Sequence, residues 1–358
     1  MQPSGGFRGN GGADNRTEER VNAAWELSAR NENLWCMTAA AAPALAPRPH
    51  APLAPARAPR QLRSLSPHLV LVANGNASRL QRQPELVEAS ARLLRSAGAR
   101  VETLVTSTLD ELESVLAGAE RRVVLLGGDG SLHAAANAPG PKPELALIPG
   151  GKANNVARSL GLPLEPRAAA RLAVEGRAHA IDAIAARTAT QRYLAVEGVS
   201  VGFHALARSQ YKGVNSADTA AAIRAGLGAL ARFEPMTMAV GLDGSCELMR
   251  LSQLFVVNMP LFGPGLRVAP SADPADGLLD VVALEGGGRL SVLRLAPKLR
   301  RGTHLGVEGV RSFQAETVRI STRGASPVIA DTTNLGSDTV ELSVVPHALE
   351  IVGKAVAA

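Results

Sequence analysis

The chain has 358 residues, and at roughly 150 residues per domain this length predicts about two domains. Hydrophobic residues make up 46% of the sequence, enough for a sizeable core, so a wholly disordered chain is excluded. No run approaches the ~18–20 consecutive apolar residues of a membrane-spanning helix. Two cysteines, Cys36 and Cys246, cannot supply a disulfide framework or a four-ligand zinc site, so we expect a cytoplasmic protein.

The formal net charge is +6, from 38 basic and 32 acidic residues, which is a modest excess. All but five of the basic residues are arginines, and alanine is abundant, which indicates a coding bias rather than a surface for nucleic acid. Aromatic residues, on which nucleic-acid bases stack, make up only 3% of the chain. We therefore exclude nucleic acid as a partner and leave an anionic membrane surface open.

Residues 1–67 differ from the rest of the chain in composition. Residues 1–15 are rich in glycine and asparagine, and residues 38–67 repeat alanine, proline and arginine with no acidic residue. The many prolines of this second stretch prevent a regular helix and favour extended, solvated chain. The composition therefore predicts a disordered tail over 1–67.

The next segment, 68–182, alternates short apolar strands with helical patterns. Such alternation is typical of a parallel sheet with helices on both faces, in which ligands bind beyond the carboxyl ends of the strands. The predicted strands are His68–Ala73, Val101–Val105, Arg122–Leu126 and Leu145–Ile148, and the predicted helices between them are Pro84–Ser96 and Leu109–Leu116.

From about residue 183 the pattern becomes rich in strands. Helical patterns appear only near Thr219–Phe233 and Leu290–Arg300. We expect a β-rich second domain over 183–350, followed by a short tail at 351–358. Its predicted strands are Tyr193–Val196, Met236–Gly241, Leu251–Val257, Leu278–Leu284, Thr317–Ile320, Pro327–Ala330 and Thr339–Val344.

Two glycine-rich loops follow two strands predicted for the first domain. The first, Gly127–Ser131 (GGDGS), follows the strand RVVLL, and the second, Ile148–Asn155 (IPGGKANN), follows the strand LALI. Glycines let the backbone approach a phosphate, and the helix N-terminus after each loop offers free N–H groups. Because the two strands belong to one parallel sheet, we expect both loops to face one cleft; a tight turn capped by Asp129 is the alternative for the first loop.

The loops resemble motifs of the diacylglycerol kinase catalytic family, which includes bacterial YegS-like lipid kinases and sphingosine kinases and is related to NAD kinases. The resemblance continues in order from about residue 68 to residue 350. The segments that carry it are Asn74–Ser78 (NGNAS), Gly127–Ser131, Pro149–Pro163 (PGGKANNVARSLGLP), Ile181-Asp182, Asn258–Gly265, Ala269–Asp280 (APSADPADGLLD), Arg301–His304 (RGTH) and Val345–Leu349 (VPHAL).

This resemblance implies an N-terminal α/β domain that holds ATP and a C-terminal β-sandwich domain that closes the cleft. It implies an enzyme that transfers the γ-phosphoryl group of ATP, with Mg²⁺, to the hydroxyl of a diacylglycerol- or sphingosine-like lipid. Such a kinase belongs to phospholipid metabolism. It would meet its lipid peripherally, at the inner face of the membrane.

The resemblance also implies three sets of site residues. Asp129 would serve as the base or as a metal partner, and Asp331 would be the second catalytic residue. Asp273, Asp276 and Leu278 would hold a structural Mg²⁺, the first and last through backbone oxygens. The nucleotide would be bound by Asn74, Ser78, Gly127, Gly128, Asp129, Gly130, Ser131, Gly151, Lys152 and Asn154.

Several positions depart from the family pattern. Lys152 and Asn155 stand where relatives have the threonine and aspartate of G-T-x-N-D, and Ala134 stands where relatives have a glutamate. The late D-G-E segment, whose glutamate is the assigned catalytic residue in bacterial members, reads Asp331-Thr332-Thr333. Thr333 cannot act as a general base near pH 7, so an impaired kinase homologue that binds nucleotide or lipid is the alternative to an active lipid kinase.

A serine hydrolase is a second alternative. Gly198–Gly202 (GVSVG) fits the nucleophile-elbow pattern G-x-S-x-G, and Asp280 with His304 or His347 follows in the order that a catalytic triad needs. The elbow requires a turn between strand and helix, whereas the apolar alternation through Phe203 predicts a strand that continues. We therefore favour the kinase.

One amphipathic segment, residues 289–301 (RLSVLRLAPKLRR), mixes cationic residues with leucine and valine. It predicts either a helix packed on the second domain or a membrane-facing edge that brings the enzyme to lipid. Pro297 is expected to break this helix.

Overall fold

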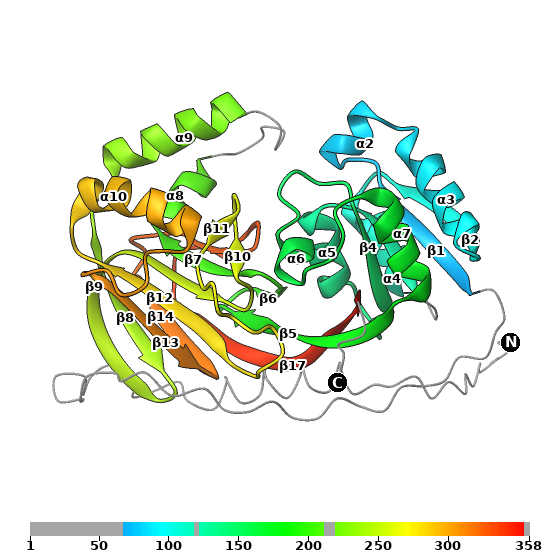
Figure 1. Ribbon diagram of the computed structural model, residues 1–358. Helices are drawn as coiled ribbons and strands as arrows, with labels where there is room; N and C mark the ends of the chain where they lie inside the picture. Colours follow the sequence, from blue (N-terminus) through cyan, green and yellow to red (C-terminus); the bar gives the residue numbers. More distant parts are fainter. Residues whose placement is uncertain (1–66, 118–121, 211–218, 354–358) are drawn as a thin grey trace, which may run out of the picture.

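The computed structural model describes residues 67–117, 122–210 and 219–353. The tail predicted over 1–67 therefore lies outside the described residues except for its last position, and so do residues 354–358. Figure 1 shows two parts side by side, an α/β part formed by the first half of the described chain and a strand-rich part formed by the second half.

The α/β part is built on four parallel strands, which confirms the predicted fold class of the first domain. In spatial order the strands are β2 (Arg100–Thr106), β1 (His68–Asn74), β3 (Val123–Gly127) and β4 (Glu144–Pro149). The helices are α2 (Ser78–Arg82), α3 (Leu86–Ser96), α4 (Leu109–Ala117), α5 (Asp129–Asn137), α6 (Asn155–Ser159) and α7 (Pro166–Glu175).

Helices cover both faces of this sheet because successive strand residues point to opposite sides. Val72 and Leu125 pack with α4 and α5 on one face. Leu71 and Leu126, each one residue away, pack with α3 and α7 on the other. All five residues of β3 are buried, as expected of a strand that is covered on both faces.

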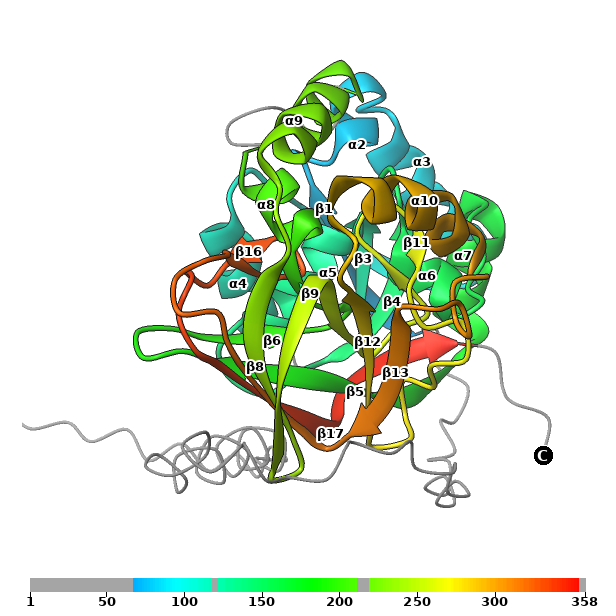
Figure 2. The ribbon, with the colours of Figure 1, turned by 90° about the vertical axis from the view of Figure 1, so that its left-hand side faces the viewer.

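The strand-rich part is antiparallel within itself. Its helices are α8 (Phe203–Ser209), α9 (Thr219–Arg232) and α10 (Gly288–Arg301), which Figure 2 shows along one edge of the sheet. Its strands are β5 (Arg177–Arg187), β6 (Arg192–Ala195), β7 (Gly198–Gly202), β8 (Met236–Leu242), β9 (Ser245–Val257), β10 (Leu261–Phe262), β11 (Leu266–Arg267), β12 (Leu279–Glu285), β13 (Val310–Ala315), β14 (Thr317–Ser321), β15 (Val328–Ala330), β16 (Thr333–Asn334) and β17 (Val340–Gly353).

The last strand, β17, joins the two parts. It pairs antiparallel with β5 and β14 of the second part. Near its end, Glu350 and Ile351 pair in parallel with β4 of the first part. The two parts therefore share one continuous hydrogen-bonded sheet, and β5 runs across the domain boundary that was expected at residue 182.

Two predictions about local structure are wrong. The strand expected to continue through Phe203 ends at Gly202, whose φ of 109° turns the chain, and α8 begins at Phe203. The helix expected to break at Pro297 continues through it to Arg301. Pro297 lies on the exposed side of α10, where water can hydrate the carbonyl that its missing N–H leaves free.

Candidate functional site

The first glycine loop makes a tight turn between β3 and α5. A Cβ at Gly127 would lie 2.2 Å from the Ser131 hydroxyl, and a Cβ at Gly128 would lie 2.8 Å from the Cα of Gly151. Real Cβ atoms do not approach other atoms this closely, so larger residues would push the loop open. The loop therefore needs glycine where it meets Ser131 and the second loop.

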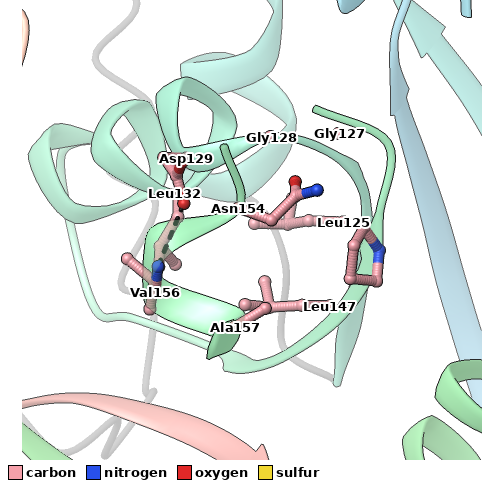
Figure 3. A pocket seen from close by; sticks show the side chains of 10 residues that line it. Leu125, Gly127, Gly128, Asp129, Leu132, Leu147, Asn154, Val156 and Ala157 are labelled. Carbon is pink, nitrogen blue, oxygen red and sulfur yellow. Dashed lines mark hydrogen bonds between the residues drawn. The ribbon is translucent and has the colours of Figure 1, made fainter. Parts of the chain in front are cut away.

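The second glycine loop packs backbone to backbone against the first. The Gly150 N–H donates to the Gly127 carbonyl over 2.7 Å. Asn154 adopts the left-handed conformation at φ 49°, and its side chain binds both the N–H and the carbonyl of Gly151. As the sequence predicted, the two loops meet at the carboxyl ends of neighbouring strands, where Figure 3 shows Asp129 and Asn154 beside one pocket.

Asp129 is fixed between the two loops. Its Oδ1 accepts a hydrogen bond from the Val156 N–H at the start of α6, 3.1 Å away, the contact drawn as a dashed line in Figure 3. The residue is partly exposed and lines the pocket together with Gly127, Gly128 and Asn154. The Val156 N–H therefore holds the Asp129 carboxylate in place through one of its two oxygens.

The loop after β1 lies against the first glycine loop. The Asn74 amide donates to the Ser131 hydroxyl over 3.1 Å. Ser78 begins the short helix α2, and Lys152 is an exposed residue of the second glycine loop. The structure thus brings the predicted nucleotide-binding residues together at one end of the parallel sheet, from the loops that follow the neighbouring strands β1, β3 and β4.

A buried polar cluster that the sequence analysis did not predict lies where the two parts meet. His133 Nε2 of α5 is 3.0 Å from Glu197 Oε1, and the Asn155 amide donates to Glu197 Oε2 over 2.7 Å. The same amide donates to the Gly263 carbonyl over 2.7 Å. Glu197 belongs to the second part, so its carboxylate ties the helices that follow both glycine loops to the strand-rich sheet.

Asp331 is a buried neighbour of this cluster. Its side chain is fully buried and accepts hydrogen bonds from the backbone N–H groups of Val196, Glu197 and Gly198, at 2.9, 2.9 and 3.1 Å. Its Oδ2 lies 3.7 Å from His133 Nε2. Asp331 thereby fixes the segment that carries Glu197.

Three carboxylates share this region with one imidazole, and their pKa values reflect that crowding. Burial lowers the pKa of His133, but the charges of Asp331 and Glu197 outweigh burial and raise it to about 9. Burial raises the pKa of Glu197 to about 7, against the opposing effect of His133. The charges of Asp129 and Asp331 raise it further. A protonated imidazole therefore stabilises a group of acids that repel one another.

Thr333 lies next to Asp331 and contributes no carboxylate. It is a half-buried residue of β16 that pairs with Ala330. A hydrogen bond links its side chain to that of Tyr193, whose pKa is raised by burial and by the charge of Asp331. The position expected for the family glutamate is thus polar and neutral.

The predicted metal-binding residues gather in one turn before β12. Asp273 Oδ1 accepts from the Ala275 N–H, and Asp276 Oδ1 accepts from the Leu278 N–H. Burial raises the pKa of Asp276, and the charges of Asp273 and Asp182 raise it further. Burial and the charge of Asp276 also raise the pKa of Asp280 to about 7. Crowded acids and nearby backbone oxygens suit a hard cation. In the described ranges, no group of three or more His, Cys, Asp or Glu side chains is spaced to enclose a metal ion.

The serine hydrolase motif does not form a triad. Ser200 lies within β7, between Phe255 of β9 and Ile329 of β15, and is fully buried. Its hydroxyl is 2.9 Å from His204 Nδ1. Of the two histidines named for a triad, His304 is engaged elsewhere, since its Nε2 binds the Val268 carbonyl. The hydroxyl of Ser200 is paired with His204 and not with His304 or His347.

A parallel α/β domain with paired glycine loops, joined to an antiparallel β domain, is the architecture of two-domain kinases of the diacylglycerol kinase type. Two family models match the chain: the diacylglycerol kinase catalytic domain over residues 68–186, and the YegS C-terminal NAD kinase beta sandwich-like domain over residues 197–353. The chain belongs to the diacylglycerol kinase and YegS-like lipid kinase family.

Individual relatives agree with this assignment, and a solved structure shares the fold. A diacylglycerol kinase of Mycobacterium tuberculosis (strain ATCC 25618 / H37Rv) is 30% identical over 275 residues, which cover 72% of this chain and 86% of that protein. A probable lipid kinase YegS-like of Stenotrophomonas maltophilia is also 30% identical, over 60% of this chain and 74% of that protein. The fold matches a putative diacylglycerol kinase from Bacillus anthracis str. Sterne with a TM-score of 0.65 at 18% identity, covering 82% of this chain and 99% of the other.

The described residues contain no helix that is long and apolar enough to cross a membrane.

The sequence did carry a signal for the buried cluster. Glu197 is the one charged residue of the largely apolar stretch Tyr193–Phe203, and a charged residue that such a stretch buries requires a partner. The sequence does not show which residues are the partners of Glu197, because His133 and Asn155 belong to the other domain.

Proposed function

We propose that the protein is an ATP-dependent lipid kinase that transfers the γ-phosphoryl group to the hydroxyl of a diacylglycerol- or sphingosine-like lipid. Family membership supports a lipid kinase. The observation that carries the proposal is the meeting of the two glycine loops around Asp129. Phosphoryl transfer depends mainly on positioning and charge neutralisation, and a carboxylate held between two phosphate-binding loops suits both.

The phosphates of ATP would lie against the first glycine loop. α5 begins at Asp129 and runs for nine residues, so the positive end of its dipole faces an anion bound at the loop. Lys152 extends from the second loop as an exposed cation and would neutralise phosphate charge. Asn74 and Ser78 border the same end of the sheet, where the nucleoside would lie.

Asp129 would take the proton of the lipid hydroxyl. The Val156 N–H holds its Oδ1, so the carboxylate keeps one orientation while it lines the pocket. Asp331 is the less suitable of the two predicted catalytic residues, because its buried side chain already accepts three backbone hydrogen bonds. We therefore propose Asp331 as a positioning residue that holds the Glu197 segment.

Mg²⁺, when bound at Asp273, Asp276 and the Leu278 carbonyl, would neutralise the acids of that turn. Asp182 connects the turn to the rest of the molecule, since it accepts from Gly277 and His347 of two separate segments. The turn is therefore fixed in place before any cation binds.

A second candidate function is a kinase homologue that binds nucleotide or lipid with little turnover. The observation that favours it is Thr333, which leaves no carboxylate where bacterial relatives carry their catalytic glutamate. The two candidates share the nucleotide loops and differ only in the rate of phosphoryl transfer.

A screen with labelled ATP and lipid acceptors in mixed micelles tests the proposed function. The parent is expected to label a diacylglycerol- or sphingosine-like lipid, and Gly128→Val is expected to abolish labelling, because its side chain would enter the contact with Gly151. Gly226→Ala is the matched control, since a Cβ at Gly226 meets nothing within 4 Å. ATP binding without any labelled lipid favours the binding protein, and equal labelling by Gly128→Val refutes the site.

A further inference from the structure

Two helices of the second domain expose leucines and carry only basic charges. α9 contains two arginines and α10 contains five arginine or lysine residues, and neither helix contains an acidic residue. Seven large apolar side chains are exposed among the described residues, and three of them, Leu227, Leu290 and Leu293, lie on these two helices. Helices of this composition are typical of the interface between lipid and water.

α10 has one face in the core and an apolar line on the opposite face. Leu295 and Leu299 are buried in a core of the second domain. Leu290 and Leu293 are 79% and 55% exposed, and together with Pro297 they follow one another at spacings of three and four residues, so they lie along one side of the helix. Exposed arginines flank this line on both sides: Arg289, Arg294, Arg300 and Arg301.

α9, whose end lies close to the start of α10, also exposes a leucine and an arginine. Leu227 is 61% exposed, and Arg224, three residues earlier, is also exposed. Arg289 at the start of α10 donates to the Phe233 carbonyl just beyond α9, over 3.3 Å, so the end of α9 lies close to the start of α10. In Figures 1 and 2, α9 lies along the upper edge of the second part and α10 lies below it, and α2, which follows the β1 loop of the proposed nucleotide site, lies at the top of the first part.

We propose that this basic leucine surface, formed by Arg224, Leu227, Leu290, Leu293, Arg294 and Arg301, docks the protein on an anionic phospholipid bilayer. The leucines enter the boundary between headgroups and acyl chains, and the arginines bind the headgroup phosphates. The inference rests on the proposed function, because the lipid acceptor of such a kinase lies in a membrane.

The exposed leucines distinguish a bilayer from nucleic acid as the occupant. A duplex would engage the arginines through its phosphates and would leave Leu290 and Leu293 in water. Base stacking would need aromatic side chains, and α9 and α10 contain none. A bilayer is the partner that uses both the charge and the apolar line of this surface.

Sedimentation with vesicles tests the proposal. The parent is expected to bind vesicles of equal parts phosphatidylcholine and phosphatidylglycerol, and to bind pure phosphatidylcholine weakly. Leu290→Ser/Leu293→Ser and Arg294→Gln/Arg301→Gln are each expected to lower the affinity for the anionic vesicles about tenfold or more. Two matched controls carry the same changes elsewhere: Leu164→Ser/Leu248→Ser removes exposed leucines, and Arg167→Gln/Arg171→Gln removes the same charge from α7.

Three results would overturn the proposal: unchanged binding by the leucine variant, an equal loss in the controls, or tight binding of a DNA duplex that only the arginine variant loses.

Phosphorylation of a short-chain acceptor, dissolved as monomers, separates this proposal from the proposed function. The surface variants should phosphorylate that soluble acceptor like the parent and phosphorylate the same lipid in vesicles more slowly. A parent that phosphorylates neither, yet binds vesicles through this surface, contradicts the proposed function alone.

Discussion

Replacing Glu197 by glutamine tests the buried cluster that joins the two parts of the molecule. The side chain is 4% exposed and has two partners, His133 at 3.0 Å and Asn155 at 2.7 Å. Hydrogen bonds to charged groups contribute about 1.5–3 kcal/mol, and removal of one partner from a buried charged pair costs about 3–5 kcal/mol. Because glutamine keeps the shape and one acceptor, we expect Glu197→Gln to lower the free energy of unfolding at pH 7 by about 2–3 kcal/mol.

The pH dependence of stability gives the same prediction a second readout. The folded pKa of His133, about 9, lies above its ordinary value of 6.5, so its contribution is fully present below about pH 6.5 and is lost as the pH rises through 9. A shift of this size corresponds to a contribution on the order of 3 kcal/mol. Glu197, whose pKa is also raised, adds a loss of the same sign between about pH 4.5 and 7. The free energy of unfolding of Glu197→Gln should therefore vary less with pH than that of the parent.

Urea unfolding followed by circular dichroism, repeated between pH 4.5 and 9.5, measures both effects. Glu308→Gln is the control, because Glu308 is exposed. If Glu197→Gln unfolds at the same urea concentration as the parent and keeps the same pH profile, the carboxylate does not pair with His133. The account of how the two parts are joined would then be wrong.

Three further predictions concern the site itself. Because Asp129 is the proposed base, Thr333→Glu should change the rate of phosphoryl transfer by less than about threefold in a labelled-ATP assay, whereas a rise of ~10²-fold would show that the parent lacks its base. Mg²⁺ should raise the melting temperature of the parent, and Asp276→Asn, which changes the one side-chain ligand of the predicted set, should abolish that rise in differential scanning calorimetry, whereas an equal rise in the variant excludes this turn. Asn154→Ala removes the two bonds that close the second glycine loop, and calorimetric titration should show at least tenfold weaker ATP binding; unchanged affinity would detach that loop from the nucleotide.

Much of the fold follows from local patterns in the sequence. The strand β3 reads VVLLG and is followed directly by a glycine loop, so its burial and the turn after it are both set by neighbouring residues. The same holds for β4 and the second loop, and the parallel arrangement then brings the loops together. The two glycine loops could be grouped from the sequence for this reason, whereas Asn74 and Ser78 were added to them by the family resemblance.

The parts that the sequence analysis missed depend on contacts between distant residues. The bond between Asn155 and Glu197 joins positions 42 residues apart, and Asp331 reaches back 135 residues to the Val196 N–H. No local pattern specifies such pairs. At Pro297, packing overrides a local signal. Proline favours a break in the helix, but the helix continues because Leu295 and Leu299 anchor it in the core.

We propose that Asp129 takes the acceptor proton at a pocket formed by the two glycine loops. The most direct measurement compares ATP affinity and the rate of lipid phosphorylation in Asp129→Asn, with the exposed Asp338→Asn as the control. We predict that the rate falls ~10²–10⁴-fold in Asp129→Asn while the Kd for ATP changes by less than about fivefold. A variant that phosphorylates lipid as fast as the parent would contradict the account.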